Sequence, residues 1–154
     1  MLSGGTLTVE STYAITGTMA VSDGTHTFTA TTGAASVESL MLSGGAVDFA
    51  GSVRVDIGTH TQTGGALGGN VVVNVSGMMT WSGGSIGGAG VLNANGGMQI
   101  NNAGTVELTG TRRINNAGAA TWMGAGNVSN SPETVFTNQP PATFTISSTG
   151  EFLG

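Results

Sequence analysis

The chain has eight carboxylates, the side chains best suited to acid–base chemistry: Glu10, Asp23, Glu38, Asp48, Asp56, Glu107, Glu133 and Glu151. A glycosidase needs two carboxyl groups about 5 to 9.5 Å apart. Asp48 and Glu107 occupy equivalent positions in a pattern that repeats about every twenty residues, but three repeats separate them. At about 4.8 Å per stacked coil, that separation is roughly 14 Å. No pair matches in both position and height, so we predict no catalytic residue and assign the carboxylates to a solvated surface.

The sequence offers no recognisable metal or nucleophile motif. Calcium-binding β-rolls need a Gly-Gly-x-Gly-x-Asp repeat, and the nearest segment, residues 87–92, lacks the aspartate. His26 and His60 are the only histidines, and His26 replaces an aliphatic residue in a predicted core position. The serines are not set in a nucleophile elbow. We therefore predict a chain that is not an enzyme and that has no metal and no cofactor.

Two tryptophans form the most suggestive aromatic pair. Trp81 and Trp122 hold the same phase of the repeat two coils apart, each preceded by a threonine. If both rings face outward they lie about 10 Å apart, a spacing on which two sugar rings could stack. The competing interpretation is that both rings pack in the core or at a corner. Trp81 and Trp122 are thus candidate glycan-contact residues, with a structural role as the alternative.

Threonine motifs raise a different hypothesis, ice binding. Thr6-Leu7-Thr8 is expected to stack on Thr25-His26-Thr27, and flat arrays of outward Thr-x-Thr order water against ice in some solenoids. The following repeats place alanine, glycine, serine and the charged residues Asp48 and Glu107 at the same positions. The predicted array is therefore interrupted after two coils.

A box of small residues returns through most of the chain and predicts its architecture. Successive boxes begin 19, 21, 20, 19, 20 and 21 residues apart. Such self-similarity is expected when one supersecondary unit is stacked repeatedly. The boxes start at Ser3, Ser22, Ser43, Thr63, Ser82, Asn102 and Met123.

Apolar and polar residues alternate after each box, as expected of half-buried strands. Two residues beyond the box lies a predicted core column, interrupted by His26 and otherwise formed by Leu7, Val47, Leu67, Ile86 and Val106. Helical spacing of apolar residues is missing, and 28 glycines with many Thr, Ser, Asn and Val residues favour short strands and turns. We predict an all-β fold, a parallel β-solenoid of about seven coils of about 20 residues, with two or three strands per coil.

The chain is expected to form a single solenoid domain over residues 1–154. Ser131-Pro132 and Gln139-Pro140-Pro141 break the pattern, so we expect an insertion and irregular structure from about 131 to 147. Residues 1–5 match residues 41–45 letter for letter, so the chain begins in mid-pattern and shows no cap. We expect either a segment of a longer repeat protein or a subunit whose open coil ends pair with another copy.

Charge and composition limit the partners. Three arginines oppose eight acids, lysine is absent, and the net charge is −5; nucleic acid is therefore not an expected partner. Cysteine is absent, so a disulfide framework is excluded. No apolar run is long enough for a membrane span, and membrane insertion is not expected.

Two further polar motifs are interpreted as structural. Ile-Asn-Asn-Ala-Gly occurs at residues 100–104 and again at 114–118, and its asparagines are predicted to turn the chain or to bond along the stack. Arg112-Arg113, between the two copies, is predicted to be an exposed turn.

Residues 4–9, Gly-Gly-Thr-Leu-Thr-Val, and 80–88, Thr-Trp-Ser-Gly-Gly-Ser-Ile-Gly-Gly, resemble the β-strand repeats of large bacterial surface proteins, of the autotransporter-passenger and filamentous-haemagglutinin kind. The resemblance is compositional and spans nearly the whole chain. It implies a right-handed parallel β-solenoid that is secreted and acts as adhesin, spacer or matrix component. We expect an extracellular or cell-surface structural or adhesive element; the alternatives are a self-assembling filament subunit, a module that binds surface glycans, and an ice-binding protein.

Overall fold

The computed structural model describes residues 1–154 and contains sixteen β-strands and no helix. All sixteen belong to one sheet in which every strand pair is parallel. The strands are β1 (Leu2–Val9), β2 (Tyr13–Ala30), β3 (Ala35–Leu42), β4 (Ala46–Gly51), β5 (Val55–Gly69), β6 (Val73–Val75), β7 (Met79–Ile86), β8 (Val91–Ala94), β9 (Met98–Ile100), β10 (Val106–Leu108), β11 (Arg113–Asn116), β12 (Ala119–Trp122), β13 (Val128–Asn130), β14 (Val135–Asn138), β15 (Thr143–Ile146) and β16 (Phe152–Leu153).

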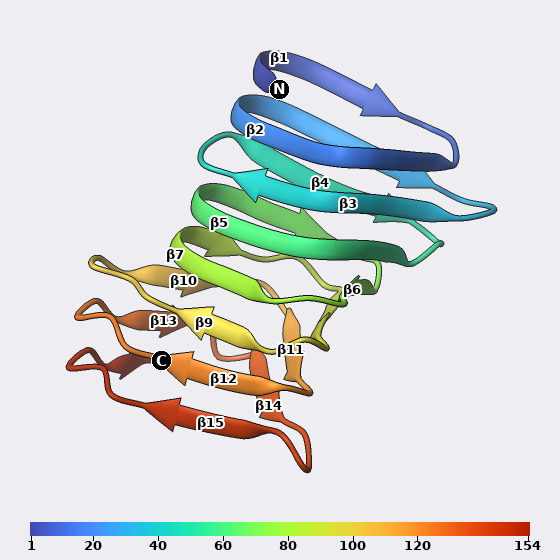
Figure 1. Cartoon of the computed structure of the whole chain (residues 1–154). Helices are drawn as coiled ribbons and strands as arrows, with labels where there is room; N and C mark the ends of the chain where they lie inside the picture. The colour runs from blue at the N-terminus through green and yellow to red at the C-terminus, as the bar shows by residue number, and fades with distance from the viewer.

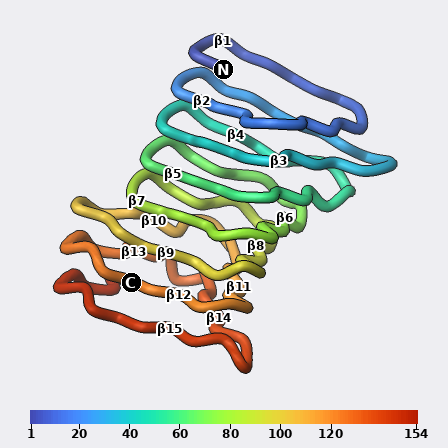
Figure 2. Tube along the Cα trace, viewed as in Figure 1, coloured from blue at the N-terminus to red at the C-terminus, as the bar shows by residue number.

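The chain winds as a β-solenoid of about seven turns, and the predicted fold class is confirmed. Figures 1 and 2 show successive coils stacked along one axis, with the N-terminus at the first coil. Each later coil contains three strands, such as β8, β9 and β10, so each coil has three sides. In earlier coils one long strand, such as β2 or β5, bends around the corners and contributes to all three sides.

We number the three sides of the solenoid and assign residues to the same side when their strands pair with one another. Side 1 holds residues 6–9, 25–30, 46–51, 66–69, 85–86, 106–108, 128–130 and 152–153. Side 2 holds residues 13–15, 35–37, 55–57, 73–75, 91–94, 113–116 and 135–138. Side 3 holds residues 18–21, 39–42, 59–62, 79–81, 98–100, 119–122 and 143–146.

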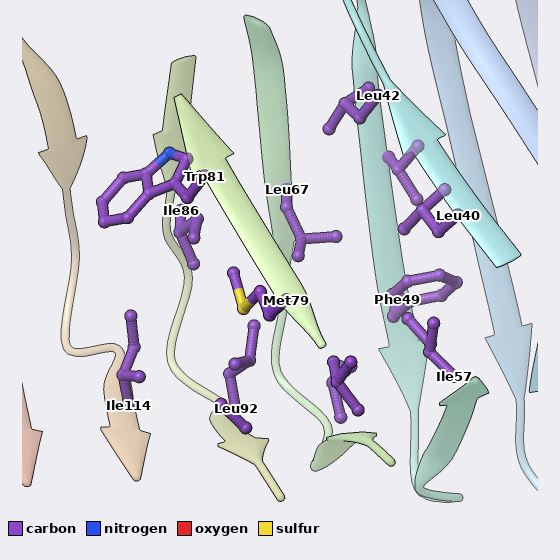
Figure 3. Close-up of a cluster of buried hydrophobic side chains, with 14 of the residues drawn as sticks. Leu40, Leu42, Phe49, Ile57, Leu67, Met79, Trp81, Ile86, Leu92 and Ile114 are labelled. Carbon is purple, nitrogen blue, oxygen red and sulfur yellow. The ribbon is translucent and has the colours of Figure 1, made fainter. Parts of the chain in front are cut away.

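The core is the interior of the coil stack. Alternate residues of all three sides point inward and form one cluster of 29 buried hydrophobic residues. Figure 3 shows part of it, with Leu40, Leu67 and Ile86 projecting from different coils into the same space. A short strand cannot bury enough apolar surface alone, so each coil depends on the coils above and below it.

The predicted core column is buried at four of its five positions: Val47, Leu67, Ile86 and Val106. Leu7 is 36% exposed because β1 has a neighbouring coil on one side only. His26 also points inward and is buried, as its place in the column requires.

The column changes register once. Ile86 pairs with Leu108, not with Val106 as the box spacing predicts. The cause is the length of the corner between sides 3 and 1: five positions separate Trp81 from Ile86, whereas eight separate Ile100 from Leu108, and Trp81 pairs with Ile100. Val106 is still buried, but it stacks on Val128 of the next coil.

The irregular segment predicted from about 131 to 147 is instead a regular part of the solenoid. β14 pairs with β11 and β15 pairs with β12, both without a register shift. Pro132, Pro140 and Pro141 lie in the turns that flank these strands, where no ladder hydrogen bond is lost. The prolines therefore mark corners of a longer coil and do not interrupt the stack.

Glycine is required at the small-residue box for two reasons. Gly24, Gly45, Gly65 and Gly84 all have a positive φ, between 66° and 83°, a region that L side chains rarely adopt. A Cβ on Gly45 would also lie 2.6 Å from the carbonyl oxygen of Gly24, and one on Gly65 would lie 2.7 Å from that of Gly45. The repeated box is thus a stack of tight corners with no room for side chains.

Leu67→Asp tests the core assignment. Leu67 is 1% exposed and packs between Val47 and Ile86 in register. An unpaired charge buried there should cost several kcal/mol and unfold the domain. Circular dichroism and thermal unfolding should show loss of the folded state, whereas Ala66→Asp, at the adjacent outward position, should remain folded. Equal stability of Leu67→Asp and the unmodified chain would contradict the register.

Candidate functional site

The candidate glycan-contact residues do not form a sugar-binding surface. Trp81 and Trp122 are 1% and 2% exposed, because their column on side 3 points inward. Trp122 Nε1 donates a hydrogen bond to Asn102 Oδ1 at 3.0 Å, and its ring packs edge-on against Phe152. The prediction that these rings contact glycans is wrong for this structure, and the structural alternative holds.

The carboxylates are dispersed over the surface. The two that the sequence placed at equivalent positions, Asp48 and Glu107, lie in different columns. Asp48 pairs with Gly68, whereas Glu107 pairs with Ser85 in the adjacent outward column, because of the register change. No group of three or more His, Asp or Glu side chains is placed to hold a metal ion. The closest charged contact is an exposed ion pair, Arg54 Nε to Asp56 Oδ2 at 3.2 Å.

Both histidines lie in the core. His60 is fully buried between Leu40 and Met79, and its Nε2 lies 3.2 Å from Gln62 Oε1. The Gln62 amide nitrogen donates to the carbonyls of Gly65 and Ser85, so its oxygen faces His60 and His60 donates through Nε2–H. Burial lowers the pKa of His60 from 6.5 to about 4, against a smaller opposing effect of the bond to Gln62.

Three buried amides connect the corners of neighbouring coils in the same way. Gln62, Asn102 and Asn116 each donate through the side-chain nitrogen to a carbonyl of their own corner and to one of the next coil. The carbonyl pairs are Gly65 and Ser85 for Gln62, Gly104 and Asn127 for Asn102, and Gly118 and Thr143 for Asn116. These bonds satisfy the buried amide nitrogens and join neighbouring coils at the corners, and the carbonyl of Asn127 also accepts from the backbone N–H of Val106.

Arg112 is also buried, so the prediction of an exposed turn at Arg112-Arg113 is wrong for Arg112. Arg113 is exposed, but it is the first residue of strand β11 and not part of a turn. Arg112 donates through Nε to the carbonyl of Gly87 at 2.6 Å and through Nη2 to that of Gly69 at 3.3 Å, reaching across two earlier coils. A Cβ on Gly90 would lie 2.9 Å from Arg112 Nη1, so the missing side chain of Gly90 makes room for the guanidinium. Burial lowers the pKa of Arg112 to about 10, partly opposed by the charge of Asp48, and the group stays protonated at neutral pH.

An asparagine ladder runs along the outer surface of side 2. Asn115 Nδ2 donates to Asn93 Oδ1, Asn93 Nδ2 to Asn74 Oδ1, and Asn74 Nδ2 to Asp56 Oδ1, at 2.8 to 2.9 Å. Asp56 ends the ladder because a carboxylate only accepts, and its other oxygen takes the bond from Arg54. The predicted ladder role of asparagine is confirmed for Asn115, while Asn102 and Asn116 serve the buried corners.

The outer surface of side 3 differs from the other two because it carries no ionisable side chain. Side 1 presents Asp48 and Glu107, and side 2 presents Asp56 and Arg113. We call the outward residues of side 3 the uncharged face. Its three columns are Thr18, Ser39, Thr59, Met78, Ala119 and Thr143; Ala20, Met41, Thr61, Thr80, Gln99, Thr121 and Thr145; and Ser22, Ser43, Thr63, Ser82, Asn101, Met123 and Ser147.

The middle column of the uncharged face offers free hydroxyl groups. The hydrogen bonds between outer side chains of this face join Thr59 Oγ1 to Ser39 Oγ and Gln99 Nε2 to Met123 Sδ. The hydroxyls of Thr61, Thr80, Thr121 and Thr145 therefore have no partner within the chain, although the four side chains lie in register. The sequence predicts such an array on side 1, at Thr6, Thr8, Thr25 and Thr27, where Asp48 interrupts it.

The fold and this surface define the chain as a three-sided parallel β-solenoid with one uncharged side. Comparisons with protein-family models, with curated proteins and with solved structures give no match. Since the chain forms no helix, no helix suited to crossing a membrane is present.

Acid should destabilise the protein through His60. The unfolded chain takes up a proton near pH 6.5 and the folded chain only near pH 4, so stability is lost as the pH falls between these values. The loss should reach about 3 kcal/mol at the lower end. Urea unfolding at pH 7, 5.5 and 4.5 should show this slope. In the His60→Leu variant the free energy of unfolding should depend less on pH, even if the variant is less stable at pH 7 because Gln62 loses a partner. An unchanged pH dependence in this variant would contradict the assignment to His60.

The asparagine ladder should contribute measurably to stability. Asn93→Ala removes two side-chain hydrogen bonds and should cost about 1 to 3 kcal/mol. A fall in Tm of roughly 2 to 10 °C is expected in calorimetry. Asn95→Ala is the matched control, since Asn95 is exposed in the following turn and makes no side-chain hydrogen bond within the chain. Equal effects of the two variants would show that the ladder adds nothing.

Proposed function

We propose that this chain is an extracellular, non-catalytic structural or adhesive β-solenoid element, of the kind that builds repeat-rich bacterial surface proteins. The observation that carries the proposal is the use made of the polar residues. The buried amides, Arg112 and the asparagine ladder all bond along the stack and hold one coil to the next. Residues that could have formed a reaction centre are instead dispersed or engaged in the architecture.

The outer surfaces support an adhesive role better than an enzymatic one. Side chains fill most of the volume inside the coils, and one apolar cavity of about 120 Å³ is lined mainly by core residues such as Trp81, Ile114 and Val128. No carboxylate or histidine lines it. The uncharged face is the continuous surface left for a partner, and we assign the adhesive role to it.

Self-assembly into a filament is the second candidate function. β1 pairs on one side only, with β2, and β14, β15 and β16 each pair with a single preceding strand. Such edges accept further parallel strands, either from adjoining coils or from a second copy. Ile146 and Phe152, 55% and 48% exposed, lie at the edge formed by the last coil.

Size-exclusion chromatography with negative-stain electron microscopy tests these proposals together with limited proteolysis. A structural element should be a compact particle that resists protease, because the coil-to-coil ladders leave little backbone free. Rapid cleavage throughout the chain under native conditions would overturn the structural proposal.

The same images decide between a single particle and a filament. Axially striated filaments would establish self-assembly. Ile146→Arg, which places a charge on the edge of the last coil, should then abolish them, whereas Val72→Arg, at an exposed site of similar size, should not. A monodisperse monomer at high concentration would reject the filament.

A further inference from the structure

We propose that the uncharged face binds ordered water at an ice surface. The inference deepens the proposed adhesive role by naming its ligand, and it rests on that role. It begins from charge: the chain has eleven charged side chains, and none stands in the three columns of this face. The carboxylate of Glu38 lies at its edge, where it lines a hollow with Thr18, Ser39 and Thr59. Charged groups hold their own oriented hydration shells, so a surface without them can be covered by a water lattice at lower cost.

The second step is the regular placement of hydroxyl groups. Thr61 pairs with Thr80 and Thr121 pairs with Thr145, with Gln99 between the two pairs in the same column. Neighbouring members of a column are about 4.8 Å apart, and outward neighbours within a strand are about 6.6 Å apart. Threonine is β-branched and stiff at χ1, so each hydroxyl and methyl group is held in a defined position.

The third step is that these hydroxyls are not used by the protein. The asparagines of side 2 bond to one another along the stack, whereas the hydroxyls of Thr61, Thr80, Thr121 and Thr145 have no partner within the chain. The backbone beneath them is held by parallel pairing from β2 through β15 (Figure 1). The result is a rigid, repeating array of free donors and acceptors interspersed with methyl groups.

Other occupants fit this face less well. Sugars stack on exposed aromatic rings, and the aromatic residues of side 3, Trp81, Trp122 and Phe144, point into the coil interior. A second copy of the chain would gain little, since a face of about 17 by 30 Å offers roughly 500 Å². A stable protein interface needs about 800 Å² on each partner.

Incorporation into slowly grown ice tests the proposal. The protein in the ice and in the remaining liquid is measured by tryptophan absorbance, and ice-crystal shape is followed by microscopy. The unmodified chain should be enriched in the ice and should facet the crystals. Thr80→Lys, which puts a charge at the centre of the face, should be excluded from ice to the level of a protein that does not bind.

Thr27→Lys is the matched control, since Thr27 is a half-buried outward threonine on side 1. It should remain in the ice fraction, and both variants should keep the circular dichroism spectrum of the unmodified chain. Exclusion of the unmodified chain, or equal loss in both variants, would overturn the proposal. Binding to microcrystalline cellulose without enrichment in ice would also overturn it, in favour of a polysaccharide. If any of these results is obtained but the particle resists protease, the ice-binding proposal fails and the proposed structural role is still supported.

Discussion

The parallel hydrogen-bond ladder between coils is the constraint on which this structure depends. Each coil must return to its starting point one strand spacing further along the axis, in register with the coil before it. Figure 1 shows the strands of successive coils lying side by side, and the chain forms 91 backbone–backbone hydrogen bonds. Because no coil can bury its apolar side chains alone, the ladder and the interior packing form together. A change in coil length is therefore tolerated only at corners, as at the long corner between Ile100 and Leu108.

The corners are where the polar chemistry of the chain is concentrated. In the early coils, stacked glycines with positive φ turn the backbone tightly. In the later coils, Asn102 and Asn116 fill wider corners and donate to their carbonyls. Arg112 does the same across two coils, in space left by Gly90. These are different ways to turn the chain at a corner and to link one coil to the next.

The three outer surfaces have separate characters although the coil interior is continuous. Side 1 carries acidic residues, and side 2 carries a ladder whose amides satisfy one another. Side 3 leaves a column of hydroxyl groups free. Since the strands hold all three surfaces at one spacing, any single side can acquire a binding role without altering the ladder. That separation makes a surface function compatible with a structural one.

The sequence by itself determined the fold class, because the spacing of the glycine box and the alternation of apolar residues are local signals that stacking requires. It also identified Val47, Leu67 and Ile86 as core and Asn115 as a ladder residue. Tertiary structure alone decided which way the tryptophans face, because the phase of a strand depends on the length of the corner before it. It likewise decided the burial of Arg112, whose guanidinium reaches the carbonyls of Gly87 and Gly69 in two earlier coils. The regularity of residues 131–147, whose prolines lie in turns, was also decided at this level. The uncharged face emerged only from the register, since its columns join residues about twenty positions apart whose shared side no local pattern reveals.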